Sequence, residues 1–194
     1  IPSSTISGIP EWYVETTGND TTGTGASGNP FASIQSAVNF ATTDGDSVTV
    51  AEGTYDENDI YLHDRNIKVV GAGIETTIID GNQANYVFQI EFASDATLAG
   101  MTIQNGAGYW GGAVTCIESA VTLKDLKITN NTAWPGGGGV YGYNTSLDID
   151  NVTFQGNHSY NFAGGLIAGR SADFNGPVTT ISIANSLFEG NTAD

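Results

Sequence analysis

The sequence predicts an all-β protein: a right-handed parallel β-helix of three-strand coils, each about 25 residues long, with an N-terminal capping α-helix. Two repeated features predict it. The phrase FQGN at residues 154–157 returns as FEGN at 188–191, and related apolar-x-x-Asn phrases stand at 79–82 and 128–131. Gly pairs followed by apolar residues recur at a similar spacing, as GGAV (111–114), GGGV (137–140) and GGLI (164–167). Short strands repeated in one order are typical of a solenoid whose coils stack.

Residues 1–46 are expected to hold an N-terminal strand, a Gly/Thr-rich loop and a capping helix over 31–43. Asn29 is the predicted N-cap and Pro30 the first helical residue. Apolar residues then follow at helical spacing, which predicts a helix lying across the open end of the first coil. Residues 47–194 form the predicted β-helix, starting with SVTVAEGTY (47–55) and ending within a coil.

The apolar residue of each phrase anchors a coil. Successive anchors, including Ile103, are 24, 25, 26 and 34 residues apart, so an insertion is expected around residues 171–178. Equivalent residues of stacked coils face inward together. One predicted inward ladder is Ile79, Ile103, Ile128, Phe154 and Phe188, and another is Leu98, Leu123, Ile149 and Ile183.

Small and polar residues recur at the corners between strands. Asn82, Asn131, Asn157 and Asn191 share one turn position, where Asn either tolerates left-handed backbone or hydrogen-bonds along its own ladder. The Gly pairs allow a positive φ or a tight approach. Gly100, Asp125, Asn151 and Asn185 stand three residues before an anchor and are interpreted as turn residues.

Aromatic residues recur in the loop between each Asn and the next Gly pair. They are Tyr109, Trp110, Trp134, Tyr160 and Phe162. A β-helix core does not need rings in its turns. The rings could bind the faces of sugars, contact a partner protein, or fold back into a small buried cluster. We treat them as candidate glycan- or partner-binding residues.

Catalytic residues are not predicted. Candidate acids are Asp80, Asp125, Asp148 and Asp150, and candidate bases are Lys124, Lys127 and Arg170. The repeat register does not gather two or three of these acids with a base on one face. The facing carboxylate pair of a glycosidase cannot be placed either.

The sequence patterns for metal binding and for glycosylation are weaker than those for the fold. His63 and His158 lack further ligands at transition-metal spacing, and Cys116 alternates inward as an inert core thiol. No cofactor is expected, although a Ca²⁺ site could form at Asp20, Asp44, Asp46 or Asp80 with loop carbonyls. Five Asn-x-Ser/Thr glycosylation sequences are expected in exposed turns: Asn19, Asn130, Asn144, Asn151 and Asn157.

Charge excludes several functions. The chain has 21 acidic and 5 basic side chains, a net charge of −16, so it is not expected to bind nucleic acid or an anionic membrane surface. It contains no run of about 18 apolar residues, so membrane insertion is not expected. High acidity and few Lys favour a secreted surface protein, and the ends of the sequence suggest a segment excised from a longer chain.

Two known families resemble this sequence. NPFASIQSAVNFATTDGDSVTVAEGTYDE (29–57), followed by NIKVVGAGIETTIIDGN (66–82), resembles the N-terminal part of secreted right-handed parallel β-helix proteins of the pectate-lyase-like superfold. The GGAV, GGGV and GGLI runs with FQGN and FEGN resemble polymorphic outer-membrane proteins, whose GGA-aliphatic and FxxN motifs repeat along a surface-exposed β-helix. The superfold includes both enzymes and adhesins, so it does not decide the function.

The sequence therefore predicts a non-catalytic extracellular segment of a larger surface protein. Its role would be adhesion or glycan binding, or assembly of a filament or surface layer. Expected partners are a glycan, copies of the chain or other surface proteins. The alternative is a polysaccharide lyase, hydrolase or epimerase of the pectate-lyase-like superfold, with its active site outside this segment or poorly visible in it.

Overall fold

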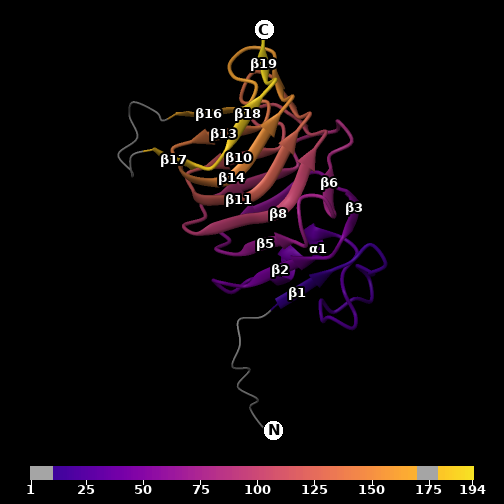
Figure 1. Cartoon of the computed structure of the whole chain (residues 1–194). Helices are drawn as coiled ribbons and strands as arrows, with labels where there is room; N and C mark the ends of the chain where they lie inside the picture. The colour runs from indigo at the N-terminus through magenta and orange to yellow at the C-terminus, as the bar shows by residue number, and fades with distance from the viewer. Residues whose placement is uncertain (1–10, 170–178) are drawn as a thin grey trace.

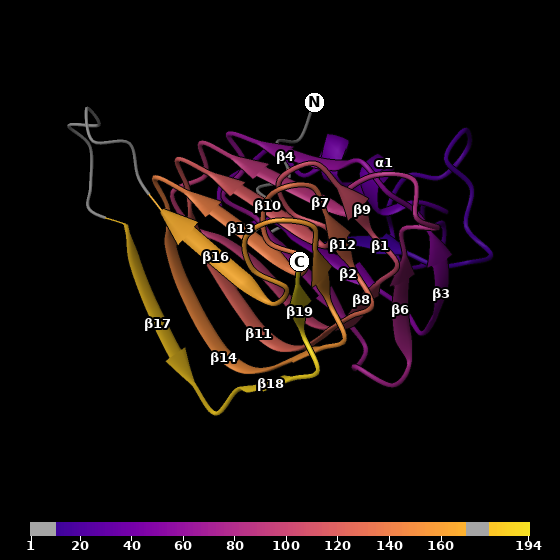
Figure 2. The same ribbon diagram turned by 90° about the horizontal axis from the view of Figure 1, so that it is seen from above.

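The chain folds as a right-handed parallel β-helix built from three sheets (Figure 1). The computed structural model describes residues 11–169 and 179–194. From above, the five-stranded and ten-stranded sheets form two walls, and the short strands close the side opposite β16 and β17 (Figure 2). The insertion expected around 171–178, and Arg170, lie outside the described residues.

The strands of each sheet repeat once per coil. The ten-stranded sheet contains β1 (Glu11–Val14), β2 (Ser47–Val50), β3 (Gly53–Asp56), β5 (Lys68–Gly71), β6 (Thr77–Asp80), β8 (Ala96–Gln104), β11 (Ala120–Thr129), β14 (Ser146–Gln155), β17 (Thr180–Ala184) and β18 (Leu187–Glu189). The five-stranded sheet contains β4 (Ile60–His63), β7 (Phe88–Glu91), β10 (Val114–Ile117), β13 (Val140–Tyr143) and β16 (Leu166–Gly169). The four-stranded sheet contains β9 (Ala107–Gly108), β12 (Thr132–Ala133), β15 (His158–Ser159) and β19 (Thr192–Ala193).

The long strands β8, β11 and β14 each bend once. At the bends, φ is 67° for Gly100, 50° for Asp125 and 55° for Asn151, and Asn185 between β17 and β18 has a φ of 52°. Gly, Asn and Asp accept this left-handed backbone most readily. The predicted turn residues are therefore confirmed. For the anchors Ile103, Ile128 and Phe154, the strand before the anchor and the strand that holds it are two halves of one bent strand, and a two-residue strand follows each of them.

Both predicted inward ladders are confirmed. Strand register pairs Ile79 with Ile103, then Ile128, then Phe154 and finally Phe188. The second ladder pairs Leu98, Leu123, Ile149 and Ile183 in the same way. The Phe154 ring is fully buried and stacks on Phe188 with centroids 4.4 Å apart and planes 6° apart. Phe188, in the last coil, keeps 43% of its surface exposed.

Buried Asn side chains join three coils at one corner. The Oδ1 atom of Asn157 accepts hydrogen bonds from the backbone N and the Nδ2 of Asn131, both 3.0 Å long. Asn191 accepts the same pair of bonds from Asn157, at 3.0 and 2.9 Å. Asn131 and Asn157 are completely buried. The hydrogen-bonded ladder, rather than left-handed backbone, therefore explains these two residues.

Asn82 does not belong to this ladder. It is exposed, and both Asn82 and the following Gln83 have positive φ, 51° and 56°. Left-handed backbone, the other predicted role, therefore explains Asn82, and two consecutive left-handed residues give this turn a different geometry from the later ones. The Gly pairs allow the backbones of neighbouring coils to approach closely. A Cβ on Gly112 would lie 2.2 Å from the carbonyl oxygen of Gly138. Any larger residue would push the coils apart.

The capping helix is shorter than predicted. Helix α1 spans Ile34–Phe40, and its N-cap is Ser33, whose side chain accepts from the backbone N of Ser36. Asn29 is not the cap, because the Phe31 backbone N donates to the Tyr13 carbonyl and holds this stretch extended beside β1. The helix packs on β1, β2 and β4, as expected of a lid over the first coil. No helix in the described ranges is long and apolar enough to cross a bilayer.

Two carboxylates attach this helix to the solenoid. Glu57, just after β3, accepts hydrogen bonds from the backbone N of Ile34 and of Gln35, at 2.8 and 2.7 Å. Asp20 accepts from the backbone N of Ala32 and of Ser33. Burial raises the pKa of Glu57 above its ordinary value, against the lowering effect of the two backbone bonds. These acids satisfy N–H groups that a helix start leaves without partners.

The ladder predicts a position-dependent cost of removing a ring. Phe154→Ala is expected to lower the free energy of unfolding by about 3–5 kcal/mol, because a fully buried ring leaves a cavity between coils. Phe188→Ala, the matched control in the same ladder, is expected to lower it by less. Urea denaturation of both variants measures the difference, and equal losses would contradict the assignment of Phe154 to a packed core.

Candidate functional site

An aromatic residue follows each of the short strands β9, β12 and β15. Because Gly108, Ala133 and Ser159 pair in register, the next residues, Tyr109, Trp134 and Tyr160, occupy equivalent places in successive coils.

These three rings are exposed by 60%, 58% and 46% respectively. The alternative in which the loops fold back and bury the rings is therefore wrong. The ring centroids of Trp134 and Tyr160 lie 5.2 Å apart, with planes tilted by 49°.

The other two predicted aromatics leave this row. Trp110 stacks on Tyr141 of β13 with centroids 5.0 Å apart and planes 26° apart, so it covers the five-stranded sheet. Phe162 is exposed by 52%, and its backbone N donates to the Pro135 carbonyl. The single aromatic stripe expected from the sequence is thus divided between two surfaces.

A groove of about 270 Å³ runs beside Trp134 and Tyr160. Its other lining residues are small or uncharged: Gln83, Ala107, Gly108, Thr132 and Ala133. The rings and Gln83 border a surface of small residues on β9 and β12. The volume is slightly below that of pockets for drug-sized ligands, and it suits one or two sugar rings. Sequence reasoning missed Gln83, because it lies in the turn after β6 rather than in the repeated loop.

Ser159 ties the loops that carry the two rings. Its buried hydroxyl lies 2.8 Å from the Gly136 carbonyl oxygen, to which it donates, and accepts from the backbone N of Asn161 and of Phe162. The loop after β12 is thereby joined to the loop after β15. Such fixed backbone presents the rings with little loss of freedom on binding.

His158 borders the rings on the coil of Tyr160. The imidazole packs edge-on against the Tyr160 ring, with centroids 4.6 Å apart. Its Nδ1 lies 2.9 Å from the Thr192 Oγ1, and its Nε2 lies 3.6 Å from an Asp194 carboxylate oxygen. Both ring nitrogens therefore face groups of the last coil.

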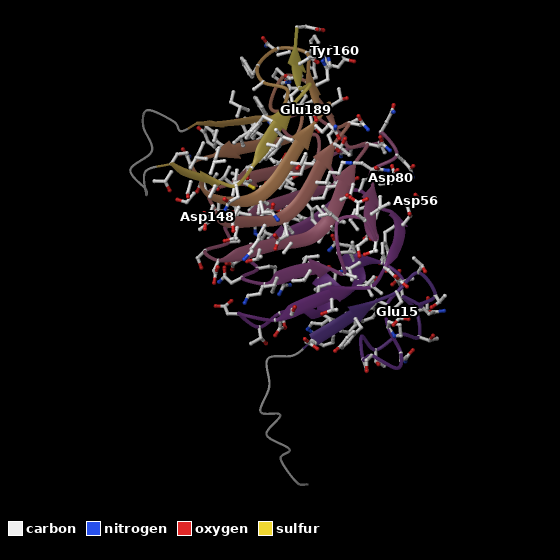
Figure 3. All side chains as sticks on the ribbon, in the orientation of Figure 1. Glu15, Asp56, Asp80, Asp148, Tyr160 and Glu189 are labelled. Atoms are coloured by element: carbon white, nitrogen blue, oxygen red, sulfur yellow. The ribbon has the colours of Figure 1, made fainter. Side chains whose placement is uncertain are left out.

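Three of the four candidate acids, Asp80, Asp125 and Asp150, accept hydrogen bonds from side-chain amides. Asp80 accepts from the side chains of Gln104 and Asn105, both at 2.8 Å. Figure 3 shows Asp80 and Asp148 far apart, on opposite sides of the solenoid in this view. Asp125 and Asp150 each accept from an Asn side chain of the next coil, Asn151 and Asn185.

Two of the three candidate bases, Lys124 and Lys127, belong to the described residues. Lys124 is paired in register with Asp150, and Lys127 with Thr153. Both lysines lie on β11. In the described ranges, no three His, Cys, Asp or Glu residues converge as a metal site.

The carboxylates suggested for Ca²⁺ serve separate turns. Asp20 binds the backbone before α1, and Asp44 accepts from the Asn66 side chain. Asp46 is buried; its Oδ2 accepts from Trp12 Nε1 and Thr43 N, and its Oδ1 has no partner. The structure does not bring these suggested ligands together.

Glycosylation sequences differ in their exposure. Asn19, Asn130 and Asn151 are exposed, as expected. Asn144 and Asn157 are buried, with 8% and 0% of their surface accessible, so the expected exposure was wrong for these two. The Asn157 side chain is held in the inter-coil ladder.

A second polar cluster, which the sequence did not predict, lies on β4 and β7. The Tyr61 hydroxyl donates to Glu91 and lies 2.8 Å from His63 Nδ1. Burial, followed by the hydrogen bond and charge of Glu91, raises the pKa of Tyr61 to about 12. His63 is therefore not isolated. Strand register places it opposite Glu91, a pairing that only the alignment of this coil with the next could reveal.

Comparison with known proteins gives one family and a few relatives. The family described as "Protein of unknown function (DUF1565)" matches residues 16–60. "Metabotropic glutamate receptor-like protein P" of Dictyostelium discoideum is 30% identical over 112 residues. The match covers 53% of this chain and 8% of that protein, so this chain spans only a small part of the relative's length.

Two solved structures are similar to this chain over most of its length. A rhamnogalacturonan lyase is 16% identical, with a TM-score of 0.47 over 95% of this chain and 51% of that chain. A pectin methylesterase in complex with hexasaccharide VII is 13% identical, with a TM-score of 0.47 over 92% and 66%. Identities this low do not transfer an activity from one protein to another.

Cys116 lies in the core, as predicted, and burial raises the pKa of its thiol to about 12. Because the thiolate is the reactive form, native protein is expected not to react with a disulfide reagent such as DTNB at neutral pH. One thiol per chain should react in urea. A Cys116→Ser, Asn161→Cys variant, with its thiol on an exposed loop, is the positive control. Native reaction of Cys116 at the control's rate would contradict this burial.

Proposed function

We propose that this chain is a non-catalytic, glycan-binding segment of a larger extracellular surface protein. The observation that carries the proposal is the groove beside Trp134 and Tyr160, two rings that remain exposed although a folded β-helix could have buried them. The expected role is adhesion to a carbohydrate surface.

The chemistry of the groove fits a sugar. One face of a pyranose ring presents C–H groups, which pack against the face of an indole or a phenol. The Gln83 amide and the Thr132 hydroxyl both donate and accept hydrogen bonds, as sugar hydroxyls require. Such a mixture of aromatic surface and a few polar groups is usual in small-molecule sites.

The placement in a larger surface protein has separate support. The receptor-like relative carries the similar stretch within a chain of which it forms only 8%. A receptor is a surface protein, which agrees with the strongly acidic composition of this chain. The location outside the cell is part of the proposal.

A polysaccharide lyase, hydrolase or epimerase is the alternative. It would need carboxylates and a cation converging near a bound sugar. Asp80, Asp125 and Asp150 instead accept hydrogen bonds from side-chain amides at strand ends and bends. Filament or surface-layer assembly would require copies of the chain to associate, which sedimentation analysis can measure.

Trp134→Ala is expected to weaken binding of glycans on an array about tenfold or more, because a ring that anchors a ligand carries much of the binding energy. Tyr160→Ala should have a similar effect. Neither variant should change the melting temperature, since both rings are exposed.

Phe162→Ala is the matched control. This ring is exposed to a similar extent and lies two residues beyond Tyr160, yet it does not line the groove. Its variant should bind like the unchanged chain. Loss of folding in Trp134→Ala would instead show that the indole serves the core, and equal binding by all three variants would reject the groove as the site.

A further inference from the structure

We propose that the groove selects an uncharged sugar, a neutral hexopyranose unit of a glycan, and rejects uronates and other anionic sugars. This inference rests on the proposed glycan-binding function and specifies its substrate class. It follows from the distribution of charge around the groove.

Among the residues that the structure describes, no charged side chain lines the groove. Its polar side-chain groups are the Gln83 amide, the Thr132 hydroxyl, the Trp134 indole N–H and the Tyr160 phenol, all neutral. Recognition of a carboxylate normally uses an Arg or Lys, whose charged hydrogen bonds repay the loss of water around the anion. A uronate placed here would lose hydration without that compensation.

The basic residues of the described ranges lie on other surfaces. Lys68 belongs to β5, and Lys124 and Lys127 to β11, all in the ten-stranded sheet. Arg65 lies in the turn after β4. The groove is built on β9 and β12 of the four-stranded sheet, so none of these cations contributes to its lining.

Two carboxylates lie near residues of the groove or their neighbours, although neither lines it. Asp80 ends β6, three residues before Gln83, and Asp194 lies 3.6 Å from the ring of His158 on the coil of Tyr160. The His158 ring nitrogens face Thr192 and Asp194. With a net charge of −16, the whole chain adds a long-range repulsion of anionic glycans.

The test is a titration with one anionic and several neutral oligosaccharides of equal length. The probes are tetragalacturonate and its fully methyl-esterified form, together with cellotetraose, mannotetraose and galactotetraose. Isothermal calorimetry on the unchanged chain, Trp134→Ala and Phe162→Ala measures each affinity at low and high salt.

The expected result is binding of at least one neutral probe, about tenfold or more tighter than tetragalacturonate and unchanged by salt. Trp134→Ala should lose this binding, and Phe162→Ala should retain it.

Two other results separate the inference from the proposed function. Tetragalacturonate binding more tightly than every neutral probe, and lost in Trp134→Ala, would overturn the neutral-sugar inference and leave the glycan-binding function standing. Absence of binding by all five probes, or binding that Trp134→Ala does not change, would overturn both.

Discussion

Parallel pairing of each strand with its counterpart one coil away places equivalent residues at the same point of every coil. Successive coils are about 4.8 Å apart, the ordinary distance between paired strands. A single coil cannot bury its apolar side, so the stack is stable only when neighbours share the register. The Ile103, Ile128 and Phe154 ladder depends on this register, and so does the row of Tyr109, Trp134 and Tyr160 on the outside.

Polar residues buried at the corners fix this register more strictly than apolar packing alone. An apolar ladder tolerates exchange of Ile for Phe, as the step from Ile128 to Phe154 shows. The Asn131–Asn157 bonds tolerate no shift, because a displaced side chain would leave several buried donors without acceptors. The corner that holds these Asn residues leads directly into the short strands and their rings. Scaffold and site therefore share one set of constraints.

The sequence was sufficient to predict the fold, because a solenoid repeats its pattern. The anchors, the inward ladders and the bend residues such as Asp125 each recur at a constant spacing. The aromatics were found in the same way. Features that occur once were predicted less well. The N-cap moved from Asn29 to Ser33 because Phe31 pairs with β1, a contact that no local propensity encodes. The turn at Asn82 differs from the later turns, because two consecutive residues there have positive φ.

The residues that line the groove could not be predicted from the sequence either. Gln83 joins Trp134 from a turn two coils earlier along the solenoid, and Ser159 ties the two ring-bearing loops through hydrogen bonds between coils. Such contacts depend on the exact stacking of unlike loops. Repeat spacing likewise could not show that Trp110 turns away to stack on Tyr141.

The most direct measurement is fluorine NMR of the chain labelled with 5-fluorotryptophan, because it contains only three tryptophans. Trp→Phe variants assign the three signals. Titration with a neutral oligosaccharide that binds is predicted to shift the signal of Trp134 and to leave those of Trp12 and Trp110 in place. A saturable shift confined to Trp110, or none at all while calorimetry records binding, would contradict the groove as the site.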